Sequence, residues 1–154
     1  MNERYIRQTM IPEIGEAGQE KLKNAKVLIV GIGGLGSPIS LYLTAAGVGQ
    51  IGLIDDDIVS SSNLQRQILY TEAEIGQSKV ECACRRLSAL NSSTRFETYP
   101  NRFTSDNADR LVSTYDIIVD GCDNAATRYL IDDVCSCFKK PYVYGAISEF
   151  RGQV

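Results

Sequence analysis

The sequence contains no histidine, and this absence excludes several kinds of catalytic site. A Ser-His-Asp triad, a Cys-His pair and a histidine-ligated metal site each need at least one imidazole from the chain. The five cysteines are Cys82, Cys84, Cys122, Cys135 and Cys137. Zinc sites favour C-x2–4-C pairs, whereas the two C-x-C pairs here would direct their thiols about 200° apart within a helix. We therefore expect buried or half-buried free thiols rather than a structural metal.

The sequence also lacks a long apolar run and a basic stripe. No apolar segment approaches the roughly 18–20 residues that span a bilayer, and residues 1–5 lack the apolar stretch of a signal peptide. The net charge is −3, whereas binding to a phosphate backbone needs clustered Lys and Arg. We expect one domain over residues 1–154, located in the cytoplasm and without membrane or nucleic-acid binding as its main role.

Short apolar runs alternate with helical segments along the chain. Strands are predicted over residues 25–30, 50–54, 94–99, 115–120 and 141–147. Helices are predicted over one or two short segments within residues 2–24, then over residues 38–46, 78–90, 105–113 and 124–138. This alternation predicts an α/β fold with a doubly wound, mostly parallel, Rossmann-like sheet. The chain ends where a further strand would begin, so we expect a sheet cut before its C-terminal strands.

A glycine-rich loop follows the first predicted strand. Gly31, Gly33 and Gly36 fit the pattern G-x-G-x-x-G, and Gly34 adds a fourth glycine. Glycines permit a tight turn and a close approach of backbone N–H groups to a phosphate, which the start of a helix also attracts. Ser37 suits the N-cap of the helix that follows, with Pro38 in its first turn and Gly47 at its end.

An acidic residue, Asp55, ends the second predicted strand, 19 residues after Gly36. An acid at this place can accept hydrogen bonds from ribose hydroxyls. Together with the loop it indicates an adenine nucleotide, but it does not separate ATP from NAD or FAD. A glycine-rich turn without any ligand is the alternative.

Polar residues after this acid favour ATP. Ser62–Gln67 has the sequence SNLQRQ, and Lys79 follows. Phosphoryl chemistry brings a triphosphate and an attacking carboxylate together, so it needs cations there, whereas a dinucleotide reductase does not. Taken singly, Arg66 and Lys79 would each be read as ordinary surface residues.

Two acids lie near the end of the fourth predicted strand, in the sequence Asp120-Gly121-Cys122-Asp123-Asn124. Ligands in open α/β sheets bind beyond the carboxyl ends of the strands, and a carboxylate there can hold Mg²⁺. Asp123 can instead be the N-cap of the following helix. The spacing does not choose between these roles. For Cys122 we favour a small buried side chain over a nucleophile.

The chain resembles the ThiF/MoeB/HesA family, bacterial relatives of ubiquitin-activating enzymes. The matching stretches occur in family order over nearly the whole chain and include residues 4–8, 31–38 (GIGGLGSP), 46–49, 53–57, 62–67 (SNLQRQ), 76 with 79, 90–91 and 120 with 123–124.

The resemblance implies ATP-dependent adenylation of the C-terminal glycine carboxylate of a ubiquitin-like sulfur-carrier protein ending in Gly-Gly, with Mg²⁺ and release of pyrophosphate. It implies that Arg7 acts in trans within a homodimer, and that Asn63, Arg66, Lys79 and Asp123 are catalytic, with Asp123 as the metal ligand. The nucleotide-binding residues that it implies are Gly31, Gly33, Gly34, Gly36, Asp55, Asp57, Ser62, Asn63, Leu64, Gln65, Arg66, Gln67, Lys79, Asp123 and Asn124.

Family members run on for roughly another hundred residues, which carry the carrier-binding surface and in many members two C-x-x-C zinc pairs and a sulfur-transfer cysteine. The resemblance therefore predicts that this chain is the nucleotide-binding part of a longer enzyme, and zinc would belong to the region beyond residue 154. Three alternatives stay open: adenylation of a peptide or tRNA-linked carboxylate, ATP binding without catalysis, and a Rossmann oxidoreductase. Neither the carrier nor the pathway follows from the sequence.

Overall fold

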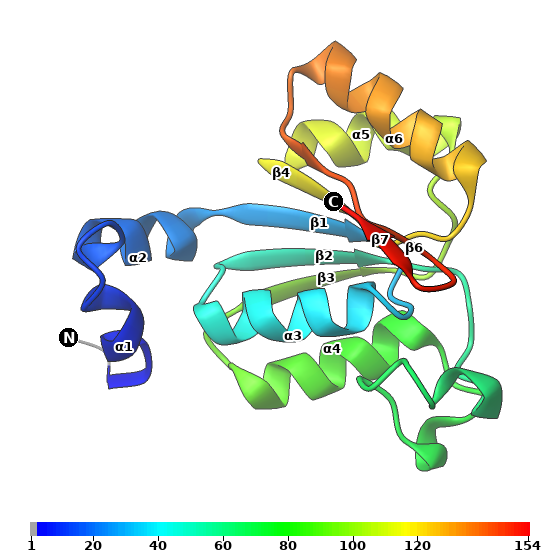
Figure 1. Cartoon of the computed structure of the whole chain (residues 1–154), viewed down its shortest axis with the longest axis horizontal. Coiled ribbons are helices and arrows are strands. Elements are labelled where there is room, and N and C mark those ends of the chain that lie inside the picture. Colours follow the sequence, from blue (N-terminus) through cyan, green and yellow to red (C-terminus); the bar gives the residue numbers. More distant parts are fainter. Residues whose placement is uncertain (1–2) are drawn as a thin grey trace.

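A computed structural model describes residues 3–154 as one sheet with helices on both faces and a small hairpin at the end (Figure 1). Asn2, the first residue of the predicted N-terminal helical segment, lies outside this range. The helices are η1 (Glu3–Tyr5), α1 (Ile6–Thr9), α2 (Gly15–Asn24), α3 (Gly36–Ala46), η2 (Ser61–Asn63), η3 (Glu72–Glu74), α4 (Lys79–Leu90), α5 (Ser105–Thr114) and α6 (Ala125–Phe138). The strands are β1 (Lys26–Val30), β2 (Gln50–Ile54), β3 (Arg95–Tyr99), β4 (Ile117–Asp120), β5 (Tyr142–Val143), β6 (Ala146–Ser148) and β7 (Arg151–Gln153).

The five-stranded sheet is parallel throughout, in the order β3-β2-β1-β4-β5. The chain leaves β1 for β2 on one side and later returns to place β4 on the other side of β1. The sheet therefore has its topological switch point between β1 and β4, where open α/β sheets bind ligands. This confirms the predicted doubly wound α/β fold.

Two hydrophobic cores cover the two faces of the sheet. Val27 and Ile29 of β1 belong to the core under α3 and α4, whereas Leu28 and Val30 belong to the core under α5 and α6. Successive side chains of a strand point to opposite faces, so a strand covered on both sides must be apolar throughout. Each such side chain contributes roughly 1.5–3 kcal/mol by its burial, which holds the strand ends in fixed positions around the switch point.

The start of α3 differs from the prediction. The helix begins at Gly36 with Leu35 as its N-cap, so Ser37 is not the cap. Leu35 already has helical backbone angles, φ −85° and ψ −43°, which brings Ser37 inside the first turn. Pro38 lies in that turn and Gly47 ends the helix with φ +88°, both as predicted.

The predicted strand over residues 141–147 is also wrong in its length. Only Tyr142–Val143 pairs with β4, and Ala146–Ser148 pairs antiparallel with β7 instead. Between them, the guanidinium of Arg128 stacks on the Tyr144 ring at 4.7 Å and donates to the Gly145 carbonyl at 3.3 Å. These contacts hold the chain where it leaves the sheet. β7 itself lies where the sequence indicates a new strand.

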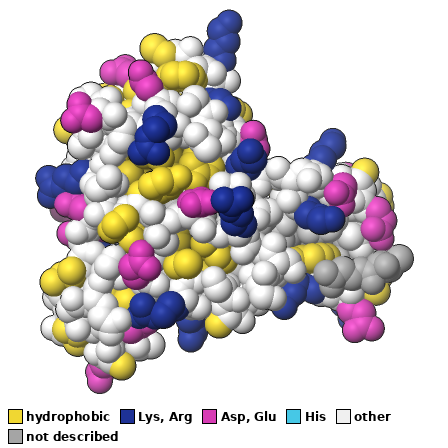
Figure 2. All heavy atoms as spheres, turned by 180° about the vertical axis from the view of Figure 1, so that it is seen from behind, with side chains coloured by type: hydrophobic (Ala, Val, Ile, Leu, Met, Phe, Trp, Pro, Cys, Tyr) yellow, Lys and Arg dark blue, Asp and Glu magenta, His cyan; other side chains and the backbone are white. Residues whose placement is uncertain are grey.

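The surface mixes hydrophobic and charged side chains. Figure 2 shows hydrophobic side chains near the centre of one face, with Lys and Arg interspersed among Asp and Glu around them. None of the helices within residues 3–154 is long and apolar enough to cross a membrane.

Candidate nucleotide-binding site

A cavity of about 840 Å³ opens at the carboxyl ends of the strands, at the switch point. Its walls come from the loops after β1, β2, β3 and β4 and from the hairpin. The lining residues are Val30, Gly31, Gly33, Gly34, Leu35, Ile54, Asp55, Asp56, Asp57, Asn63, Arg66, Gln67, Lys79, Asn101, Arg102, Phe103, Gly121, Cys122, Asp123, Asn124, Thr127, Arg128, Ala146 and Ile147. This volume falls within the usual range for small-molecule sites.

The glycine loop packs against backbone from two directions. Gly31 has φ +86°, which favours glycine, and a Cβ on Gly36 would lie 2.1 Å from the Gly31 oxygen. A Cβ on Gly121, after β4, would lie 2.5 Å from that same oxygen. The loop, the start of α3 and the β4 loop therefore fit together only because these positions lack side chains.

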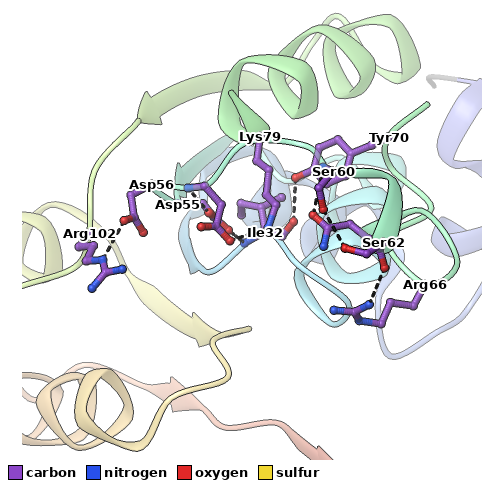
Figure 3. Close-up of polar contacts among 11 residues, drawn as sticks. Ile32, Asp55, Asp56, Ser60, Ser62, Arg66, Tyr70, Lys79 and Arg102 are labelled. Atoms are coloured by element: carbon purple, nitrogen blue, oxygen red, sulfur yellow. Dashed lines mark hydrogen bonds and ion pairs between the residues drawn. The ribbon is translucent and has the colours of Figure 1, made fainter. Parts of the chain in front are cut away.

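Protein groups hold the Ile32 backbone within the loop on both sides. The Asp55 carboxylate accepts a hydrogen bond from the Ile32 N–H at 2.7 Å, and the Tyr70 hydroxyl donates one to the Ile32 carbonyl, also at 2.7 Å (Figure 3). Asp55 therefore fixes the loop, a role beyond the ribose contact that the sequence predicts.

The three successive acids after β2 each have a different partner. Besides its bond to Ile32, Asp55 accepts from the Asp57 N–H at 2.9 Å. Asp56 pairs with Arg102 at 2.8 Å, and Asp57 pairs with the Lys79 ammonium at 2.8 Å (Figure 3). The Lys79 side chain is only 4% exposed. An ammonium this buried needs a counter-ion, and Asp57 supplies it.

The Arg66 side chain is exposed, unlike that of Lys79. Its guanidinium donates to the Ser62 carbonyl at 3.2 Å and lies beside Gly34, whose added Cβ would be 3.6 Å from the arginine. The neighbouring Gln67 is 4% exposed and its Oε1 has no hydrogen-bond partner within residues 3–154. A buried amide oxygen without a partner is costly, and Gln67 lines the cavity with its amide nitrogen next to Gly33.

The structure of the loop after β4 tests whether Asp123 is the N-cap of the following helix, one of its two predicted roles. The N-cap of α6 is Asn124, whose side chain accepts from the Thr127 N–H at 2.9 Å. Asp123 is exposed at the cavity and, within residues 3–154, has neither a hydrogen bond nor an ion pair. The helix cap is therefore excluded as its role.

Asp120, in contrast, is fully buried and satisfied. Its carboxylate accepts from the Cys122 N–H at 2.8 Å, from Arg128 Nε at 2.9 Å and from the Tyr142 hydroxyl at 2.9 Å. This carboxylate joins the end of β4 to α6 and β5. It holds the loop that carries Asp123.

Cys122 lies half-buried in the cavity wall. Burial, and then its hydrogen bond and charge interaction with Asp120, raise the pKa of the thiol to about 12. The thiolate is the reactive form of cysteine, so this thiol stays protonated and is a poor nucleophile near neutral pH. All five cysteines are free, and Cys82 and Cys135 are buried.

Most of the residues that the sequence singles out come together in this cavity, but five do not line it. Gly36 packs against Gly31, and Leu64 packs against the core under α3 and α4. Ser62 reaches the site only through its carbonyl, which binds Arg66, and Gln65 is exposed. Arg7 is exposed on α1, at the amino end of the sheet, opposite the cavity.

Sequence reasoning missed Tyr70, Arg102 and Arg128. Arg102 and Arg128 line the cavity, and they pair with Asp56 just after β2 and with Asp120 at the end of β4. Tyr70 lies behind the glycine loop. The motifs do not include these residues, because they lie far from the motifs along the chain. Arg102 could still have been predicted, because it follows the carboxyl end of β3, where ligands bind in such sheets.

The ThiF family model matches residues 5–154 of the chain. The chain belongs to the ThiF family. It is 50% identical to the sulfur carrier protein adenylyltransferase of Thermus thermophilus over 99% of its own length and 56% of that protein. It is 49% identical to the probable adenylyltransferase/sulfurtransferase MoeZ of Mycobacterium tuberculosis, over 97% of this chain and 38% of MoeZ. This ThiF-family chain therefore spans about half, or less, of the length of these relatives.

Solved structures of other enzymes share the fold of this ThiF-family chain. The E. coli tRNA N6-threonylcarbamoyladenosine dehydratase TcdA in complex with AMP superposes with a TM-score of 0.84 at 28% identity, over 90% of this chain and 56% of TcdA. E. coli MccB with AMPCPP and MccA superposes with a TM-score of 0.83 at 32% identity, over 94% of this chain and 45% of MccB.

One cluster of acids and one single acid could each hold a metal ion in this ThiF-family site. Among residues 3–154, the carboxylates of Asp55, Asp56 and Asp57 lie within 4.8 Å of one another. Each of these three carboxylates already bonds a backbone N–H group or a cation, whereas Asp123 has no partner within residues 3–154. Mg²⁺ takes one or two carboxylates together with substrate phosphates. The residues present therefore fit such an ion best at Asp123.

Proposed function

We propose that this chain is the ATP-binding part of an enzyme that adenylates the C-terminal glycine carboxylate of a ubiquitin-like sulfur-carrier protein. The observation that carries the proposal is the convergence of the glycine loop, Asp55, Arg66, Lys79 and Asp123 on one cavity at the switch point. The identity of 50% to a sulfur carrier protein adenylyltransferase supports this substrate over those of TcdA and MccB, which are 28–32% identical. Its expected compartment is the cytoplasm.

The cavity suggests how the nucleotide lies. Phosphates would lie at the glycine loop and the start of α3, where free backbone N–H groups and the helix dipole favour anions. The ribose would lie by Asp55, and the base beyond it, towards Asn101 and Phe103 at the end of β3. Arg66 and Asn63 line the phosphate end of the cavity.

In the reaction, a carrier carboxylate oxygen attacks the α-phosphorus, and the bond from that phosphorus to the pyrophosphate oxygen breaks. An acyl-adenylate and pyrophosphate result. Arg66 and Lys79 offset the negative charge that collects when the two anions meet, and Asp57 keeps the Lys79 ammonium in place. Mg²⁺ at Asp123 would neutralise phosphate charge when bound. Positioning supplies most of the catalysis in such a transfer.

Arg7 would act in a second copy of the chain. It lies at the amino end of strands of about five residues, and each residue of a strand advances about 3.3 Å, so the sheet separates it from its own cavity. A homodimer that places α1 of one copy over the cavity of its partner would complete the site.

Nucleotide binding is the first test. ATP with Mg²⁺ at 100 times its Kd should stabilise the chain by roughly 2.7 kcal/mol in a thermal shift experiment, and NAD should not stabilise it. The second test is ATP–pyrophosphate exchange by the chain in its full-length protein. Exchange should depend on a carrier ending in Gly-Gly and disappear with a carrier that lacks these two residues. Stabilisation by NAD alone, or exchange that ignores the carrier terminus, would refute the proposal.

A further inference from the structure

Tyr70 is buried behind the glycine loop and points its hydroxyl at the loop backbone (Figure 3). The hydroxyl donates to the Ile32 carbonyl at 2.7 Å. On the other side, Asp55 accepts from the Ile32 N–H at 2.7 Å. Two successive peptide groups of the loop are therefore fixed by side chains that come from outside it.

The planarity of the peptide bond extends this restraint to Gly33. The carbonyl of Ile32 and the N–H of Gly33 belong to one trans peptide, in which they point in opposite directions. With the carbonyl bonded to Tyr70, the Gly33 N–H points away from Tyr70. Gly33 lines the cavity, and within residues 3–154 its N–H has no acceptor. A free backbone donor at this place suits an anionic oxygen.

Tyr70 also joins the loop to the segment that carries Arg66. Its own N–H donates to the Gln67 carbonyl at 3.2 Å, and the Gln67 N–H donates to the Asn63 carbonyl at 2.9 Å. One residue thus fixes the distance between the glycine loop and the 63–67 segment. These are the two walls between which the phosphates would lie.

We propose that Tyr70 is a positioning residue whose hydroxyl holds the Ile32–Gly33 peptide so that the Gly33 N–H is presented to a nucleotide phosphate. The proposal rests on the ATP binding proposed above. Burial, and then the nearby charge of Asp55, raise the pKa of Tyr70. The hydroxyl therefore keeps its proton, and remains a donor, well above neutral pH.

Tyr70→Phe and a matched control test this role. Tyr115 is also buried, and its hydroxyl bonds to the Tyr99 hydroxyl at 3.0 Å in the opposite core, away from the cavity. Both Phe variants lose one buried hydroxyl, so both should melt earlier. Only Tyr70→Phe should weaken the binding of ATP with Mg²⁺, by about tenfold in calorimetric titration. Without the Tyr70 hydroxyl the Gly33 N–H is no longer held towards the charged phosphate, and the hydrogen bond between them is lost. Equal affinity in the two variants would overturn the proposal.

The Gly33 amide of the unaltered chain gives a second test that does not depend on a folded variant. In a ¹⁵N NMR titration, ATP should shift the Gly33 amide resonance and slow its hydrogen exchange. If ATP binds and the Gly33 amide does not respond, the role of Tyr70 is refuted while ATP binding stands. If ATP does not bind at all, the proposed function itself fails.

Discussion

The acids after β2 and the acids at and beyond the end of β4 occupy the same edge of the sheet but differ in their partners. Asp55, Asp56 and Asp57 are each bonded to another protein group. At the end of β4, the buried Asp120 accepts three hydrogen bonds, whereas Asp123, three residues further on, accepts none within residues 3–154. The difference teaches that a carboxylate near a strand end has a structural role where it bonds other protein groups. Where it has no protein partner, it can bind a ligand.

The largest effect should come from the acid without a partner. Asp123→Asn removes the charge that would hold Mg²⁺, and we expect ATP–pyrophosphate exchange by the full-length protein to fall by about a hundredfold or more. The melting temperature should not change, because Asp123 supports no other described residue. Asp133→Asn on α6 is the control, an exposed acid outside the cavity. Unchanged exchange in Asp123→Asn would refute the metal role.

Asp120 should show the opposite result, with its main effect on stability. Asp120→Asn leaves Arg128 without its counter-charge at a buried position, and breaking such a pair costs about 3–5 kcal/mol. Urea denaturation of the chain should show this loss in the free energy of unfolding. A loss below about 1 kcal/mol would mean that Asp120 is not what holds the β4 loop, and the comparison between the two acids would fail.

The fold followed from the sequence because both faces of the sheet are covered. Strands that are buried on both sides are apolar throughout, so the run 50–54 is predicted with the correct bounds and the run 25–30 begins one residue before β1. The predicted strand over residues 141–147 is too long, because apolar composition does not reveal where a chain turns out of a sheet. Here the contacts of Arg128 with Tyr144 and Gly145 accompany that turn, and no local pattern encodes them.

The site was predictable where one short motif carries several side chains. For the 62–67 stretch and for the glycine loop, the sequence predicts which residues lie close together, because residues of one short loop are neighbours in space. Partners from distant segments were not predictable in this way: Tyr70 lies 38 residues from Ile32 in the chain, and Arg102 lies 46 residues from Asp56. The same limit left Asp123 undecided, because the choice of Asn124 as the α6 cap depends on backbone geometry.

The smallest effect should come from Asp56, whose partner Arg102 is exposed to solvent. Exposed ion pairs are screened by water and salt and contribute little to stability. Asp56→Asn should therefore shift the melting temperature by about 2 °C or less, and added salt should remove the shift. Asp57→Asn is the matched comparison, because it removes the same group one residue along but leaves the buried Lys79 ammonium unpaired. A larger loss of stability in Asp57→Asn than in Asp56→Asn, with little dependence on salt, would show that the exposure of the partner determines how much each acid contributes to stability. Equal losses in the two variants would show that it does not.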